Sequence, residues 1–253
     1  MDRHVFHATF NQTGAVILPV IHVLDTAQAE RNIQTALDGG CPGVFLINHD
    51  FEKEKLLPII RDVRKTFPDL WIGVNFLAVT GEFAFPILGQ LQAQGTSVDG
   101  YWADDACIDE RRDASDQPQA AAITAARQAS GWQGLYIGGT AFKKQRDVDP
   151  AHYARSAEIA CNHMDVVVTS GVATGHAADL TKIKTFRAHC GETALGLASG
   201  ITPENAEQYK DDVDLFMVAT GINFDGDFYN IDPDRLRKLM QITQNQESSN
   251  HDI

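Results

Sequence analysis

The stretch DVVVTSGVATGHAADLTKIKTFRAHCGETALGLASG, residues 165–200, contains one complete strand–helix–strand repeat. Its apolar runs at 165–171 and 193–200 are continuous rather than alternating, which is typical of parallel strands covered on both faces. The segment between them, 178–189, follows small and polar residues that can cap a helix. Both apolar runs contain Ser-Gly at their carboxyl ends, so the stretch predicts two parallel strands that each lead into a tight turn.

The same alternation runs through the whole chain. Further strands are predicted at 15–22, 43–48, 70–76, 98–104, 134–140 and 213–221. Helix-like segments follow the strands at 26–40, 52–67, 83–95, 119–131, 149–162, 178–189, 202–210 and 232–246. Eight such units without a linker predict an α/β fold, a single-domain (β/α)8 TIM barrel over residues 1–253, in which 1–14 form an N-terminal cap and 247–253 a disordered tail. A doubly wound open sheet is the alternative, but no Gly-x-Gly-x-x-Gly follows the first predicted strand.

Composition limits the classes of partner. Lys and Arg total 21 and Asp and Glu total 34, so the net charge of −13 argues against nucleic acid as a partner. No apolar run approaches the about 18 residues that cross a bilayer, and the N-terminus lacks the apolar core of a signal peptide. We therefore expect a cytoplasmic protein with no membrane partner and with its four cysteines reduced. Assembly into a homo-oligomer stays open.

In a barrel, catalytic side chains gather at the carboxyl ends of the strands. His22 ends the first predicted strand, Asp50 follows the second, and Asp104 ends the fourth. A histidine titrates near neutral pH, and a carboxylate in a dry cavity has a raised pKa, so these three residues are the catalytic candidates. Their structural alternatives are a buried core histidine, a salt bridge and a helix cap.

The turns after the last three strands are rich in glycine and small residues. Gly200 allows positive φ, and Thr202-Pro203 fits the start of a helix whose free N–H groups would point into the barrel mouth. Because barrels often bind phosphate after strands seven and eight, we predict a phosphate site there, closed from the side by the turn after strand six. Its predicted residues are Gly171, Thr174, Gly175, Ser199, Gly200, Thr220 and Gly221. The alternative is a set of ordinary strand-to-helix turns.

The predicted function is therefore that of an enzyme binding a small phosphorylated molecule, such as a sugar or nucleotide phosphate. The reaction class stays open among isomerases, lyases and transferases. No cofactor or metal site is predicted from motif spacing, although Asp50 and Asp104 leave Mg²⁺ and a metal-dependent lyase or hydrolase open. A non-catalytic assembly factor that uses the barrel as a scaffold is the other alternative.

Residues 165–237 resemble the BtpA family of TIM-barrel proteins. The matching positions are Ser170, Gly171, Thr174, Gly175, Ser199, Gly200, Thr202, Asn205, Gly226, Asn230 and Asp232. The resemblance implies a barrel fold and a site at these turns; the family is linked to photosystem I biogenesis in phototrophs, and other members look like uncharacterised enzymes. This chain departs from the family pattern at WADDACID (102–109) and GGTAFKKQ (138–145), after strands four and five, which implies a distinct substrate.

Overall fold

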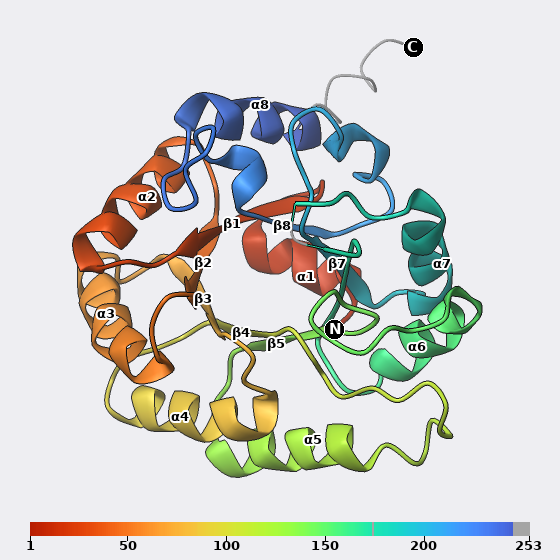
Figure 1. Ribbon diagram of the computed structural model, residues 1–253. Helices are drawn as coiled ribbons and strands as arrows, with labels where there is room; N and C mark the ends of the chain where they lie inside the picture. Colours follow the sequence, from red (N-terminus) through yellow and green to blue (C-terminus); the bar gives the residue numbers. More distant parts are fainter. Residues whose placement is uncertain (174, 245–253) are drawn as a thin grey trace.

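The computed structural model describes residues 1–173 and 175–244, and its centre is a closed barrel of parallel strands in the order β1 to β8, with β8 pairing back to β1 (Figure 1). The strands are β1 Val16–His22, β2 Gly43–Asn48, β3 Trp71–Phe76, β4 Gly100–Ala103, β5 Leu135–Gly139, β6 Val166–Ser170, β7 Ala194–Ala198 and β8 Leu215–Val218. Each strand lies inside a run predicted from its apolar residues. The (β/α)8 barrel is thus confirmed, and the open-sheet alternative is wrong because the sheet closes on itself.

Helices surround the barrel, one after most strands. The α-helices are α1 Arg3–Phe10, α2 Thr26–Asp38, α3 Lys53–Thr66, α4 Gly81–Ala93, α5 Pro118–Ser130, α6 Tyr153–Ala160, α7 Leu180–Cys190 and α8 Pro233–Gln244. Short 3-10 helices are η1 Pro150–His152, η2 Ala206–Gln208 and η3 Thr220–Ile222. The predicted tail, 247–253, lies outside the described residues. Within the described ranges, no helix combines the length and hydropathy needed to cross a bilayer.

The helix predicted over 202–210 is wrong, because only η2 forms between β7 and β8. Asn205 supplies the physical reason. Its side-chain oxygen accepts a hydrogen bond from the Thr202 N–H at 2.9 Å, and its amide donates to the Gly200 carbonyl at 2.7 Å. Such local side-chain bonds compete with helix propagation. The turn after β7 therefore does not present an α-helix N-terminus to the barrel mouth.

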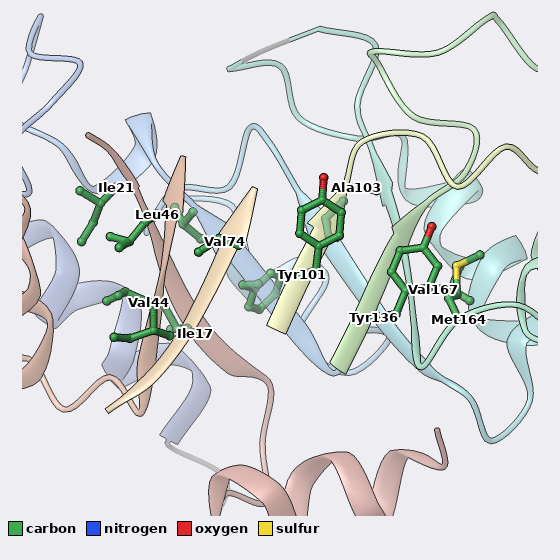
Figure 2. Packing of buried hydrophobic residues seen from close by; sticks show 14 of the residues in the cluster. Ile17, Ile21, Val44, Leu46, Val74, Tyr101, Ala103, Tyr136, Met164 and Val167 are labelled. Carbon is green, nitrogen blue, oxygen red and sulfur yellow. The ribbon is translucent and has the colours of Figure 1, made fainter. Parts of the chain in front are cut away.

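Strand residues alternate between two apolar clusters, which explains the continuous apolar runs. Ile17 and Ile21 of β1 point outward into a cluster shared with the helices, whereas Val16, Leu18 and Val20 belong to a cluster inside the barrel. Figure 2 shows part of the outer cluster, with Ile21, Leu46 and Val74 on β1, β2 and β3. Because both faces are buried, neither face of a strand needs polar residues.

The N-terminal end of the barrel is closed by α1. Phe6 and Phe10 of this helix join the cluster inside the barrel, and Figure 1 shows α1 across the centre of the ring of strands. Beside it, the fully buried Asp214 carboxylate contacts Arg3, His7 and Arg187 at 2.9 to 3.0 Å. Burial alone would raise the pKa of Asp214, but the hydrogen bond from His7 and the two arginine charges lower it. This end is therefore packed and paired, which leaves the opposite end for a ligand.

Candidate functional site

A pocket with about 660 Å³ of empty space, its open entrance included, lies at the carboxyl ends of the strands. Apolar side chains of the strands form its floor, among them Val20, Ile47, Trp102 and Met217. Its polar rim is built from the turns that follow the strands. The rim residues are His22, His49, Asp104, Lys143, Lys144, Gly175, Ser199, Gly200, Thr220 and Gly221. Residues from all eight strands or the turns after them thus meet in one cavity, as is usual for ligand sites in this fold.

The turns after β6, β7 and β8 pack backbone against backbone. A Cβ atom on Gly200 would lie 2.1 Å from the carbonyl oxygen of His176, and one on Gly221 would lie 1.8 Å from that of Ile201. Gly200 also has φ of +70°, next to Ser199 at +78°. Glycine is therefore required at these positions because the turns pack closely against each other. A bulky residue at Gly200 would displace the turns themselves.

Four backbone N–H groups in these turns have no acceptor. Within the part of the chain that the structure describes, the N–H groups of Ser199, Gly200, Thr220 and Gly221 donate no hydrogen bond, and all four residues line the pocket. We call these four groups the N–H cluster. Backbone donors that are unpaired inside a cavity are uncommon in folded proteins and suit an anion. The cluster can therefore donate hydrogen bonds to the oxygens of a phosphate group.

Of the remaining residues of the predicted phosphate site, Gly175 lines the pocket and Gly171 does not. Gly175 lines the pocket beside the N–H cluster, has φ of +77°, and has open space where a side chain would start. Gly171 does not line this pocket; it lines a neighbouring cavity, and a Cβ atom there would lie 2.3 Å from the carbonyl oxygen of His176. Thr174 lies outside the described residues.

Asp104 lies in the pocket and is almost fully buried. One of its carboxylate oxygens accepts a long hydrogen bond, 3.4 Å, from the side-chain amide of Asn75, the last residue but one of β3. Gln145 donates to its backbone carbonyl at 2.9 Å and so fixes the strand end. Burial raises the pKa of Asp104, while the nearby Lys143 acts in the opposite direction. A carboxyl group in this state is suited to taking and giving a proton. The neighbouring Asp105 instead accepts the Cys107 N–H in its own turn.

Lys143 faces the pocket from the turn after β5. Its backbone N–H donates to the Ser170 hydroxyl at 2.9 Å. The buried Lys182 ammonium holds the same turn by donating to the carbonyls of Ala141 and Ser170 at 2.6 and 2.8 Å. Burial lowers the pKa of Lys143. The turn therefore involves two lysines: the buried Lys182 stabilises it, and Lys143 lines the cavity.

His22 lies where β1 meets the pocket, stacked on Phe228 with ring centroids 3.8 Å apart. Its Nδ1 is 3.1 Å from the Phe228 carbonyl, which can only accept, so Nδ1 carries the proton and Nε2 is left as an acceptor. Burial, and next the charge of His49, lower the pKa of His22 to about 4. His22 is therefore neutral at pH 7 and suits hydrogen bonding better than proton donation.

Asp50 does not line the pocket. Its exposed carboxylate accepts a hydrogen bond from the Tyr229 hydroxyl at 2.8 Å and lies 3.4 Å from Nδ1 of His49. The hydrogen bond from Tyr229 lowers the pKa of Asp50. This hydrogen bond joins the loop after β8, which carries Phe228, to the segment that follows β2. The residue of this region that contacts His22 is His49: the two rings meet edge-on, with their centroids 5.6 Å apart.

Asp50 and Asp104 are not brought together, so they do not form the pair of metal ligands that the sequence left open. Among the described residues, no group of three or more His, Cys, Asp and Glu side chains is arranged to hold a metal ion.

Two parts of the site were missed by sequence reasoning. Phe228, which covers His22, comes from a polar loop without periodicity, so no sequence signal marks it. Lys182 did carry a signal: it stands beside Ile183 and four residues before Phe186, on the buried face of α7. A lysine on the apolar face of a helix indicates a buried cation with a specific partner.

The closed barrel with a pocket at its carboxyl end defines a (β/α)8 TIM-barrel protein. Its C-terminal part carries the sequence pattern of the BtpA family, whose profile matches residues 144–245 and includes the turns after β6, β7 and β8. The predicted resemblance to this family is thereby confirmed over that range. The chain has no significant match among curated proteins.

Solved structures share the fold at low identity. The tryptophan synthase alpha chain from Legionella pneumophila subsp. pneumophila aligns with a TM-score of 0.66 and 16% identity, covering 98% of this chain and 99% of that chain. Phosphoribosyl anthranilate isomerase from Thermus thermophilus aligns with a TM-score of 0.58 and 14% identity, covering 90% and 97%. At these identities the likeness shows the fold alone.

Proposed function

We propose that this protein is an enzyme that binds a small phosphorylated molecule, with the phosphate group at the N–H cluster. The observation that carries the proposal is the set of four backbone donors, from two adjacent turns in a single pocket, that have no acceptor among residues 1–173 and 175–244. Phosphate oxygens would give each donor the acceptor it lacks.

The charge distribution supports the same proposal. The protein carries a net charge of −13, yet two lysines, Lys143 and Lys144, line this pocket. Asp104 follows β4, which is opposite β8 in a closed eight-stranded barrel, so its carboxylate lies across the pocket from the proposed phosphate. One protein of similar fold is named for a phosphoribosyl compound, which agrees with the proposal at the level of the fold.

The pocket favours an enzyme over a scaffold. A scaffold needs no cavity at the barrel mouth, whereas this cavity combines an apolar floor with Asp104, Lys143 and His22 at its rim. Asp104 is the proposed acid or base, and His22 is proposed to orient the ligand through Nε2. Asp50 is proposed to position the covering loop.

The phosphate site is tested by introducing charge at Gly175. Because a side chain there meets open space, both Gly175→Asp and the neutral control Gly175→Asn fit, and Asn and Asp tolerate positive φ alike. Calorimetric titration with inorganic phosphate should show at least about tenfold weaker binding for the Asp variant, as ~1.4 kcal/mol of charge repulsion produces. The Asn variant should bind like the wild type. Equal affinities of the two variants, or no binding by the wild type, would contradict the proposal.

A further inference from the structure

The side of the pocket opposite the N–H cluster carries two opposite charges. In the closed strand order, β4 lies across from β8 and β5 across from β1. β7 lies across from β3, so a ligand held by its phosphate at the turns after β7 and β8 extends toward the ends of β3 and β4, and the end of β5 lies next to that of β4. Asp104 and Lys143 line the pocket there.

These two side chains lie near each other without forming an ion pair. Each affects the pKa of the other, but their charged atoms are not within ion-pair distance, and the Lys143 ammonium forms no salt bridge or hydrogen bond with any described residue. Its nearest aromatic contact is the Phe142 ring, at 5.8 Å from the centroid. The carboxylate of Asp104 has one long hydrogen bond, from Asn75. Both groups thus retain capacity to bond an atom placed between them.

The surroundings hold both groups in place. The turn of Lys143 is fixed by Ser170 and by the buried Lys182, and it includes Ala141 at φ of +47°. Gln145 joins the ends of β4 and β5, because its amide donates to the backbone carbonyls of both Asp104 and Gly139. A strained, multiply bonded turn is a common feature of functional sites, where it sets the geometry before a ligand arrives.

We propose that Asp104 and Lys143 are a catalytic acid–base pair that enolises a phosphorylated aldehyde or ketone. The Asp104 carboxylate takes the proton from the carbon next to the carbonyl group. The C–H electron pair forms the carbon–carbon double bond, and the carbonyl electron pair moves to oxygen, which takes a proton from the Lys143 ammonium. To complete an isomerisation, the Asp104 carboxyl gives its proton to the former carbonyl carbon while the hydroxyl on the neighbouring carbon becomes the new carbonyl and returns its proton to the Lys143 amine. Both side chains are thereby restored without a further reactant.

The environment supports this chemistry. An enolate oxygen develops negative charge, and an ammonium group in a cavity with an apolar floor stabilises such charge more strongly than one in water. The shifts of both groups toward neutrality also bring their proton affinities closer together, which favours transfer in both directions. This inference rests on the proposed phosphate site, because that site orients the ligand.

The experiment follows exchange of carbon-bound hydrogen in D2O. Glyceraldehyde 3-phosphate, ribose 5-phosphate and glucose 6-phosphate are each incubated with the protein, and proton NMR records loss of the signal next to the carbonyl group. For at least one of them we expect exchange about 100-fold above buffer, which a positioned acid–base pair supplies. Lys143→Met and Asp104→Asn should each lower that exchange by about the same factor. Lys184→Met, at an exposed lysine of α7 outside the pocket, should leave it unchanged.

Calorimetric binding to the same three compounds separates the two proposals. Binding without exchange, or binding of inorganic phosphate but of none of the three, overturns the acid–base pair and leaves the phosphate site standing. No binding of phosphate or of any of the three overturns both. Unchanged exchange in Lys143→Met removes Lys143 from the reaction. If Lys143→Met does not fold, Lys143→Arg replaces it: a guanidinium keeps the charge but holds its proton too tightly, so binding without exchange is expected.

Discussion

The two ends of the barrel differ in how fully their polar groups are hydrogen bonded. At the N-terminal end, the buried Asp214 is bonded to three basic side chains and to the Leu195 N–H. At the mouth, Asp104 and the Lys143 ammonium are left with little or no bonding, and the N–H cluster has no acceptor among the described residues. Four non-glycine residues with positive φ also lie in turns at the mouth: Ala78, Cys107, Ala141 and Ser199. One end is built for stability, and the other retains strain and unpaired groups that a ligand can use.

The largest expected effect comes from breaking the paired end. Asp214→Asn removes the negative charge that Arg3, Arg187 and the His7 ring contact, so we expect the free energy of unfolding to fall by about 3–5 kcal/mol. The lowered pKa of Asp214 fixes the pH dependence: its stabilisation is present above the ordinary pKa of an aspartate and is lost as the pH falls through the lower, folded-state value. Urea unfolding at pH 7 and at pH 3 measures both.

The half-buried Asp212, two residues earlier, provides the control for this effect. Asp212→Asn should change the free energy of unfolding by less than about 0.5 kcal/mol. A similar fall in the free energy of unfolding in both variants would mean that this segment is sensitive to any substitution. Charge pairing would then not explain the difference between the two ends of the barrel.

The next effect concerns His22, at the mouth. The folded-state pKa of about 4 lies below the unfolded value, so the unfolded chain binds a proton at His22 before the folded chain does. Stability should therefore fall as the pH drops from about 7 to 4.5, with His22 accounting for about 2–3 kcal/mol of the loss. In His22→Gln this part of the pH dependence should disappear, whereas His4→Gln, at an exposed position on α1, should retain it. Parallel unfolding curves for the wild type and His22→Gln over this range would show that His22 is not held neutral.

The barrel was predictable from sequence because its strands are buried on both faces. Continuous apolar runs at near-regular spacing arise from that double burial, and they mark every strand of the structure. The segment after β7 was predicted incorrectly because propensity favoured a helix, whereas the side-chain bonds of Asn205 favour a tight turn. Local competition between side chain and backbone depends on geometry that a propensity pattern does not contain.

The site was predictable only in part, for a related reason. Residues that end a strand, such as His22 and Asp104, lie at the mouth by topology, and the sequence identifies them. The positive φ predicted for Gly200 is confirmed, but its close approach to the His176 backbone of another turn could not be predicted from sequence. The relation between Lys143 and Lys182 was not visible either, since it depends on how α7 packs against the turn after β5. Contacts between separate units require the folded structure.

The smallest expected effect has the opposite sign and separates function from stability at the mouth. Burial raises the pKa of Asp104, so its ionised form costs stability at neutral pH. Asp104→Asn should increase the free energy of unfolding at pH 7 by about 1 kcal/mol, the lower end of what an incompletely bonded buried polar group costs. The gain should vanish below about pH 4, where the unfolded carboxyl is also protonated. Asp147→Asn, at an exposed position of the loop after β5, should give no gain. A loss of stability in Asp104→Asn would mean that the Asp104 carboxylate is bonded as fully as that of Asp214. A gain of stability together with loss of hydrogen exchange in the phosphorylated compound would mean that Asp104 serves the reaction and destabilises the fold.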